Sequence, residues 1–439
     1  MENNTQLKEM IRSMVIDVLQ GQKQEMASSQ PIKQAPRGQV DPGVFDTVDE
    51  AIQAAKAAQA RFEDCTLATR EKVIADIRAA MRPRVQELAQ KTVEETGMGR
   101  VADKVLKLNL TLDKTPGVED LVTECETGDN GMTLYELSAY GVIGAITPST
   151  NPAETLICNS IGMLAAGNAI FFSVHPGAKN LSRELVSELN QVIAKSIGIE
   201  NLIVTLREPS IESAQEMMLH PDVSLLVVTG GPGVVKQALQ SGKKVIGAGA
   251  GNPPAFVDET ADIKKAAQDI VLGASLDNNI LCIAEKSVVA MRQIEPQLVQ
   301  EMVKAGCVLL ENQQDIQRLV DLTVLPNGTP NKKFVGKNAS VILDAAHIPY
   351  NGDPRLIIMR APKNHPFAVI EMLMPILPVV TVDSFDEGLD VCLKLEAGLH
   401  HTATMHSLNM ERLNQMARKM KTSIFVKNGP SYAGLGFSG

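Results

Sequence analysis

The sequence has no tryptophan and only four tyrosines, and its acidic residues outnumber its basic ones by 51 to 42. Proteins that bind nucleic acid usually present a basic surface with aromatic side chains for stacking. The net charge of −9 therefore argues against a nucleic-acid partner. An acidic ligand would need local donors, such as helix N-termini, because the overall charge of the protein repels it.

The sequence also lacks paired cysteines and long apolar runs. Its six cysteines are scattered singly, without a CxxC pair, which is typical of a reducing compartment. No apolar run approaches the ~20 residues that span a bilayer, and the N-terminus has no signal-peptide pattern. These absences predict a soluble intracellular protein that does not bind a membrane.

Residues 1–20 carry an apolar stripe at helical spacing, followed by a polar, Pro- and Gly-containing segment over residues 21–43. The stripe consists of Leu7, Met10, Ile11, Met14, Val15, Val18 and Leu19. This pattern predicts an amphipathic helix on a flexible linker. The helix could fold back on the body of the protein, or its apolar face could bind a partner helix or groove.

The rest of the chain changes from a helical pattern to alternating strands and helices. Residues 44–112 are helical in pattern, and afterwards nearly all-apolar strands alternate with amphipathic helices. Such βαβ units form a parallel sheet that helices cover on both faces. Ligands bind beyond the carboxyl ends of such strands, which directs attention to the loops after Ile146, Val174 and Val228. A second α/β pattern occupies residues 253–428.

Three loops are candidate binding segments. The turn from Thr229 to Gly233 joins an apolar strand to a helix, so its backbone amides could approach a pyrophosphate. A glycine-rich turn after a strand is, however, often only a tight turn that binds no ligand. The loop over residues 147–152 is polar, but Ser, Thr, Asn and Pro are also ordinary turn residues. Residues 247–254 are rich in glycine and contain no acid or base, which suggests close approach of another backbone.

Cys282 follows amide side chains at the point where a polar turn becomes apolar, so it could be a nucleophile with a lowered pKa or simply a buried side chain. The apolar neighbours of Cys158 and Cys392 predict that both are buried. His400, His401 and His406 cluster without a zinc-ligand pattern, which leaves a polar role near a site or a structural role at a helix end.

From Val44 to its end, the chain resembles the aldehyde dehydrogenase superfamily, and most closely the CoA-acylating propionaldehyde and acetaldehyde dehydrogenases of bacterial microcompartments. The resemblance rests on ETGMGR, TPGVED, TGDNGMTL, TPSTNP, AAGNAI, HPGAKN, LLVVTGG, GAGAGNPP, DNNILC, HPFAVIEMLMPILPVV, LHHTATMHS and TSIFVKNGP, in this order. It implies an α/β fold with a Rossmann-type cofactor domain (44–120 and 141–252), oligomerisation strands (121–140) and a catalytic domain (253–439).

The resemblance also implies residue roles. Cys282 would be the nucleophile, Asn151 would supply an oxyanion-hole amide, with Thr150 as the alternative, and His401 would act beside them. His175 stands where hydrolytic members carry a lysine for the adenosine ribose, and Glu371 matches the glutamate that binds the nicotinamide ribose. The NAD-lining residues would be Ile146, Thr147, Pro148, Ser149, His175, Pro176, Thr229, Gly230, Gly231, Gly249, Glu371 and Leu373.

Ala248 stands where hydrolytic members carry a glutamate general base. Without a base to activate water, a thioester on Cys282 would be transferred to coenzyme A. Propionaldehyde is the first substrate choice and acetaldehyde the second, whereas a hydrolytic enzyme and a non-catalytic scaffold are the rival interpretations. The N-terminal helix resembles the encapsulation peptides that bind microcompartment shell or core proteins. The expected protein is a homo-oligomer inside a microcompartment of the bacterial cytoplasm.

Overall fold

The computed structural model describes residues 41–437. The amphipathic helix predicted over residues 1–20, and nearly all of the linker after it, lie outside the described residues. Among the described residues, no helix combines the length and apolar character needed to cross a membrane. The described part of the chain likewise contains no cluster of three or more His, Cys, Asp or Glu side chains that could hold a metal ion.

The first part of the chain is helical, as its sequence pattern predicted. The helices are α2 (Val48–Glu63), α3 (Leu67–Met81), α4 (Val85–Thr96) and α5 (Val101–Lys114). Thr47 caps α2 by accepting a hydrogen bond from the backbone N–H of Glu50. Gly97 ends α4 in the left-handed region with φ 65°, which glycine adopts without steric cost. The turn at Gly97 lets the chain reverse into α5.

A parallel sheet of six strands follows, in the order β1-β6-β5-β4-β7-β8. Its strands are β1 (Val44–Phe45), β4 (Val142–Ile146), β5 (Ala169–Ser173), β6 (Ile203–Leu206), β7 (Val223–Thr229) and β8 (Lys244–Ala248). The connecting helices are α6 (Pro152–Ala165), α7 (Lys179–Ile197), α8 (Ile211–Leu219) and α9 (Pro232–Leu239). Every residue of β4, β5 and β6 is buried, which explains why these strands read as continuous apolar runs.

The second parallel sheet has seven strands, in the order β11-β12-β13-β10-β9-β14-β15. Its strands are β9 (Pro254–Val257), β10 (Ser287–Met291), β11 (Cys307–Leu310), β12 (Leu356–Arg360), β13 (Ile376–Val382), β14 (Thr402–His406) and β15 (Ile424–Lys427). Its helices are α10 (Ile263–Ser275), α11 (Glu295–Lys304), α12 (Gln313–Thr323), α13 (Ala339–Ala345), α14 (Pro366–Val369), α15 (Phe385–Glu396) and α16 (Met410–Met420).

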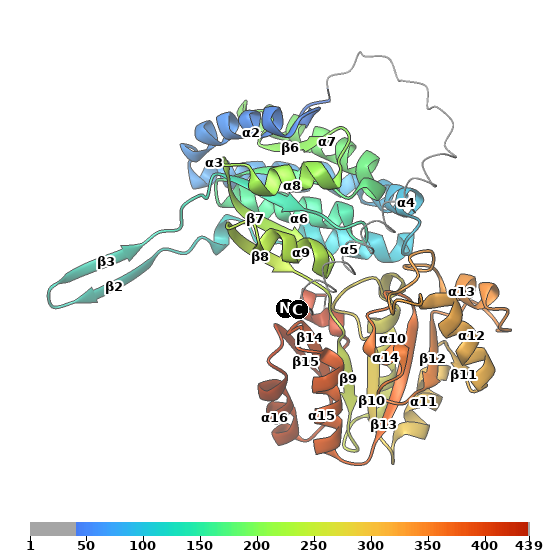
Figure 1. The fold of residues 1–439 in the computed structure, drawn as a ribbon. Coiled ribbons are helices and arrows are strands. Elements are labelled where there is room, and N and C mark those ends of the chain that lie inside the picture. The colour runs from blue at the N-terminus through green and yellow to red at the C-terminus, as the bar shows by residue number, and fades with distance from the viewer. Residues whose placement is uncertain (1–40, 438–439) are drawn as a thin grey trace, which may run out of the picture. The chain divides into compact units, whose positions relative to one another are not determined.

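An antiparallel hairpin forms a third, small sheet, drawn as an arm in Figure 1. It consists of β2 (Glu124–Gly128) and β3 (Gly131–Tyr135), and every residue of both strands is exposed. The sequence of residues 133–140, TLYELSAY, is rich in β-forming residues and would predict a strand as far as Tyr140. The strand instead ends at Tyr135, whose partner Glu124 is the first residue of β2.

Candidate active site

The glycine-rich segment after β8 brings three distant parts of the chain together. A Cβ atom on Gly251 would lie 2.5 Å from the carbonyl oxygen of Cys282 and 3.0 Å from Cγ of the His401 ring. No side chain larger than hydrogen fits there without displacing one of them. This close approach accounts for glycine at position 251 and places Gly251, Cys282 and His401 in one site.

The thiol of Cys282 is partly buried, and burial raises its pKa, although the Lys286 cation acts in the opposite direction. The sequence left open a thiol of lowered pKa or a simply buried side chain, and the direction of the pKa shift in the structure does not agree with the first of these. Cys282 also lies in a turn between a short 3-10 helix, η4 (Leu276–Asn279), and β10, so it begins neither a helix nor a strand. Desolvation is therefore the main obstacle to forming the thiolate.

Lys286 is a buried charged residue near Cys282 that the sequence analysis did not single out. Its buried amine donates hydrogen bonds to the carbonyl oxygen and Oδ1 of Asn279, at 2.7 and 2.6 Å, and to the carbonyl oxygen of Leu281, at 2.9 Å. Burial lowers the pKa of Lys286 to about 8, so below that pH the amine is mostly charged and favours the Cys282 thiolate. Its only signal in the sequence is a charged residue at the start of an apolar strand.

Glu371 joins the site through the same glycine. Its Oε1 accepts a hydrogen bond of 3.0 Å from the backbone N–H of Gly251. Burial raises the pKa of Glu371, and the Lys286 cation opposes this shift. Leu373, two positions further on, is left-handed at φ 52°, and its carbonyl oxygen accepts a hydrogen bond from Gly336. Glu371 thus shares a glycine neighbour with Cys282.

The expected cofactor loops lie at the carboxyl ends of neighbouring strands of the first sheet. Ile146 ends β4, and the Thr147 amide bonds the carbonyl oxygen of Ser173 at the end of β5. Thr229 ends β7, and the Gly230 amide bonds the carbonyl oxygen of Ala248 at the end of β8. Pro148 and Ser149 follow β4, Pro176 begins a 3-10 turn after β5, Gly231 precedes α9 and Gly249 follows β8.

This edge fits a dinucleotide. Gly231 is the N-cap residue of α9 and has no side chain, so it cannot cap the first backbone amides of that helix. Such a helix N-terminus can bind a pyrophosphate despite the net negative charge of the protein. Nδ1 of His175 accepts a hydrogen bond of 3.0 Å from the Gly177 amide, and burial lowers the pKa of this histidine. His175 therefore presents a polar ring at this edge.

The candidate oxyanion loop lies at the start of α6. Oδ1 of Asn151 accepts a hydrogen bond from the Lys107 amine, and its Nδ2 lies 3.3 Å from Oγ1 of Thr150. The carbonyl oxygen of Thr150 accepts a hydrogen bond of 2.8 Å from Nζ of Lys104. Both candidate residues are thus held by lysines of α5, and the Asn151 amide is oriented with its nitrogen as the remaining donor.

The three clustered histidines have separate positions. His401 lies against Gly251, and burial, together with the Lys286 cation, lowers its pKa. Nδ1 of His401 is 2.8 Å from Oγ1 of Thr402. His400 is exposed and left-handed, whereas His406 lies inside β14, where burial lowers its pKa to about 4. Only His401 belongs to the site.

Of the two cysteines predicted to be buried, one is buried and one is not. Cys392 is buried in α15, as predicted, whereas Cys158 is exposed on α6, so that prediction was wrong. The buried face of α6 is formed by residues such as Leu156, Ile157 and Ile161, and Cys158 projects from the other face. A run of apolar neighbours in a helix therefore did not indicate burial of every residue within it.

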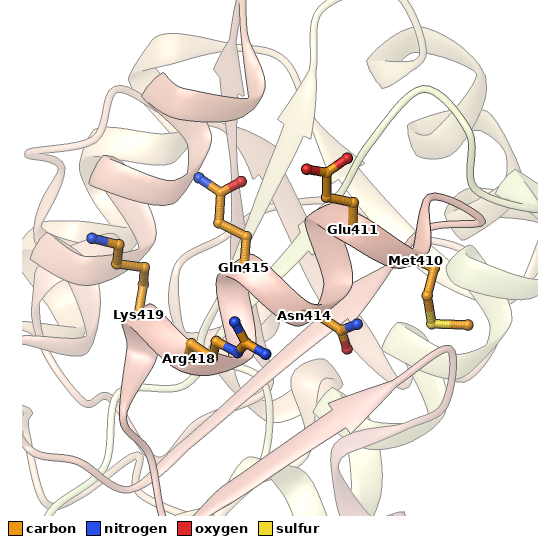
Figure 2. Close-up of a pocket in the computed structure, with 6 residues that line it drawn as sticks. All are labelled: Met410, Glu411, Asn414, Gln415, Arg418 and Lys419. Atoms are coloured by element: carbon orange, nitrogen blue, oxygen red, sulfur yellow. The ribbon is translucent and has the colours of Figure 1, made fainter.

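A surface hollow along α16 is separate from these residues. Figure 2 shows its lining, which comes from α16 alone: Met410, Glu411, Asn414, Gln415, Arg418 and Lys419. None of these side chains is among the candidate catalytic or cofactor-binding residues. This hollow is therefore not part of the candidate site.

Residues 18–436 match the aldehyde dehydrogenase family, and the chain belongs to this family. It is 50% identical over 438 residues to the propanal dehydrogenase (CoA-propanoylating) of Salmonella typhimurium, covering 100% of this chain and 92% of the relative.

Solved structures of similar proteins agree with this assignment. The propionaldehyde dehydrogenase of Rhodopseudomonas palustris, with bound CoA and an acylated cysteine, is 48% identical, with 91% of each chain covered and a TM-score of 0.88. A propionaldehyde dehydrogenase from the Clostridium phytofermentans fucose utilisation bacterial microcompartment is 46% identical, with 91% of each chain covered and a TM-score of 0.89. An engineered glycolyl-CoA reductase with bound NADP+ is 47% identical, with 90% of each chain covered and a TM-score of 0.88.

Proposed function

We propose that this chain is a CoA-acylating aldehyde dehydrogenase that converts propionaldehyde, NAD and coenzyme A to propionyl-CoA and NADH. The observation that carries the proposal is the convergence of Cys282, Glu371 and His401 on Gly251, with the alanine of β8, Ala248, in place of a carboxylate. This site has a nucleophile and no residue at that position to deprotonate water. The relatives named above support CoA as acyl acceptor and propionaldehyde as substrate.

In the proposed reaction, the Cys282 sulfur forms a bond to the aldehyde carbon, and the carbonyl electron pair moves to oxygen. The Asn151 amide and the Cys282 backbone N–H stabilise this oxyanion, each by about 3 kcal/mol. When the carbonyl re-forms, the carbon loses hydride and a thioester on Cys282 results. The loops at the carboxyl ends of the first sheet would hold NAD, which would supply the hydride acceptor. Glu371, which lies beside Gly251, would orient the cofactor ribose.

The thioester is then attacked by the CoA thiolate, and Cys282 departs as a thiolate. Lys286 favours the thiolate in both steps, because its charged amine opposes the rise in the pKa of the Cys282 thiol that burial causes. Ala248 supplies no proton acceptor for water, so hydrolysis has no general base at this position. The acyl group therefore goes to CoA rather than to water.

The direct test compares NADH formation from propionaldehyde and NAD with and without CoA. Continuous NADH formation should require CoA, and propionyl-CoA should form in equal amount. Steady NADH formation without CoA, accompanied by free propanoate, would instead identify a hydrolytic enzyme. The same assay with acetaldehyde compares the two substrates, and propionaldehyde should give the higher kcat/KM.

The two sheets and the hairpin support separate functions for three parts of this enzyme. We assign residues 44–120 and 141–252 to cofactor binding, residues 253–439 to catalysis and residues 121–140 to subunit association. The hairpin exposes Met132 at 69%, Leu134 at 56% and Tyr135 at 50% of their surface. Exposed apolar side chains on an arm of this kind favour burial against another subunit. The mass of the protein in solution tests this proposal, and a mass that is a multiple of the 47.2 kDa chain is expected.

The N-terminal segment is proposed to bind a shell or core protein of a microcompartment through its apolar stripe, which includes Ile11 and Val15. Deletion of residues 1–20 should leave kcat and KM within about twofold of wild type, because the predicted linker over residues 21–43 separates this segment from the catalytic residues, and changes away from a site rarely have large effects. The same deletion should abolish co-sedimentation with purified microcompartments. A truncated enzyme that still co-sediments, or that loses solubility, would contradict this role.

A further inference from the structure

The turn that precedes the nucleophile is strained. Asp277, Asn278 and Asn279 all adopt left-handed backbone conformations, with φ of 50°, 56° and 65°. L-residues rarely enter this region, and three in succession occur only where the surroundings dictate the geometry. All three side chains are fully buried. The chain therefore maintains an unfavourable backbone three to five residues before Cys282.

Asp277 ties this turn to helix α5. Its Oδ2 accepts hydrogen bonds from Nζ of Lys104 at 2.9 Å and from Nζ of Lys107 at 2.5 Å. Its Oδ1 accepts a hydrogen bond of 2.9 Å from the backbone N–H of Arg100, and its own N–H donates to Oδ2 of Asp103 at 2.9 Å. Asp277 and Lys104 have no exposed side-chain surface. The turn is thus held by buried, charged contacts from another segment.

The same two lysines hold the candidate oxyanion loop. Lys104 also bonds the carbonyl oxygen of Thr150, and Lys107 also bonds Oδ1 of Asn151. Lys107 forms a further ion pair with Glu154, with its nitrogen 3.1 Å from Oε1. The two lysines thus face the carboxylates of Asp277 and Glu154, while the third buried carboxylate, Asp103, pairs with Arg355. The lysines bridge the two parts of the site that must meet at the aldehyde carbonyl.

We infer that Lys104, Lys107 and Asp277 are positioning residues that fix the separation between the Asn151 amide and the Cys282 thiol. Burying such ions contributes little net stability, because desolvation offsets their attraction, so geometry is the benefit that the structure retains. The inference rests on the proposed function, in which Cys282 attacks the aldehyde and Asn151 receives the oxyanion. None of the three touches the reacting atoms in this scheme.

The test is the Asp277→Asn variant. Asparagine has a similar shape and tolerates the left-handed backbone, so the change removes chiefly the charge that both lysines share. The first-turnover rate of NADH formation should fall about 10- to 100-fold, as expected for a small misplacement of reacting groups. The KM for NAD and the rate of Cys282 alkylation by iodoacetamide should stay within about threefold of wild type, because neither uses the oxyanion amide.

The matched control is Asp258→Asn. Asp258 is also fully buried, and its Oδ2 accepts a hydrogen bond from Ser407 at 2.7 Å and lies 3.3 Å from Nη1 of Arg412. It belongs to no part of the proposed site. Its variant should lose thermal stability and keep a wild-type first turnover. A comparable fall in first turnover would show that any buried aspartate has this effect, and the inference would fail.

A second variant tests the inference in case Asp277→Asn folds poorly. Asp277→Asn combined with Lys104→Met restores charge balance, with Lys107 facing Glu154. Its thermal stability should recover, while the first turnover stays slow because Thr150 has lost its lysine contact. Recovery of the wild-type rate would overturn the inference, as would an equal fall in alkylation. If Cys282→Ala is inactive but Asp277→Asn is fully active, only the inference fails; an active Cys282→Ala variant rejects the proposed function itself.

Discussion

Replacing Cys282 with alanine should abolish the oxidation of propionaldehyde and the reverse reduction of propionyl-CoA together, with a loss of at least about 10⁴-fold in each direction. Both directions pass through the same thioester, so no route remains when the sulfur is removed. The substitution should leave the fold intact, because Cys282 is a small, partly buried residue in a turn. Initial rates in both directions, measured at saturating substrates, check this result.

The control for this experiment is Cys158→Ala. Cys158 is exposed on α6 and belongs to no part of the proposed site, so its variant should keep wild-type rates and wild-type stability. Loss of activity in that variant, or substantial activity in Cys282→Ala, would move the nucleophile elsewhere. The pair also separates catalytic loss from general damage by cysteine replacement.

Replacing Ala248 with glutamate should change the product. Ala248 is the last residue of β8 and its side chain is exposed, so a longer side chain has room at this position. A carboxylate there could deprotonate a water that attacks the acyl group on Cys282. CoA-independent release of propanoate should rise about 100-fold, the lower end of what a placed base contributes, because the following glycines do not fix the side chain.

Formation of propionyl-CoA should fall in the same variant, because in the proposed mechanism the CoA thiol would approach Cys282 past this position, where glutamate adds bulk. Ala248→Gln is the matched control, with the same length and no charge at neutral pH. It should reduce propionyl-CoA formation without releasing propanoate. Quantifying both products by chromatography decides the matter, and a folded Ala248→Glu enzyme that binds NAD and still forms only propionyl-CoA would refute the role given to the missing base.

The sequence predicted apolar strands such as β4 and β13, because these are buried on both faces and carry little besides apolar residues, but it missed the short apolar strands β9 and β11. It did not identify β14, where Thr402, Thr404 and His406 alternate with apolar residues although the whole strand is buried. Polar residues of that kind look solvent-exposed until the neighbouring strands are known. The sequence analysis consequently did not place His406 in a strand or His400 and His401 directly before one.

The candidate catalytic residues were recognised from motifs, whereas the residues that hold them were not. Lys104 and Lys107 resemble ordinary surface lysines of an amphipathic helix, yet both are buried. Their partner Asp277 lies far along the chain, so no local spacing connects them. Contacts of this kind depend on how the two sheets meet, and a single sequence gives no signal of that. Lys286 was missed for a different reason: its partners Asn279 and Leu281 are near in sequence, but nothing in the sequence indicates that its amine is buried.

The most direct test of the central claim is a single turnover without CoA, followed by mass spectrometry of the peptide that contains Cys282. Enzyme mixed with propionaldehyde and NAD should form one NADH per active subunit and carry a propionyl group on Cys282. Later addition of CoA should release that group as propionyl-CoA and restore continuous NADH formation. Continuous NADH formation before CoA is added, or a propionyl group on a residue other than Cys282, would contradict the mechanism.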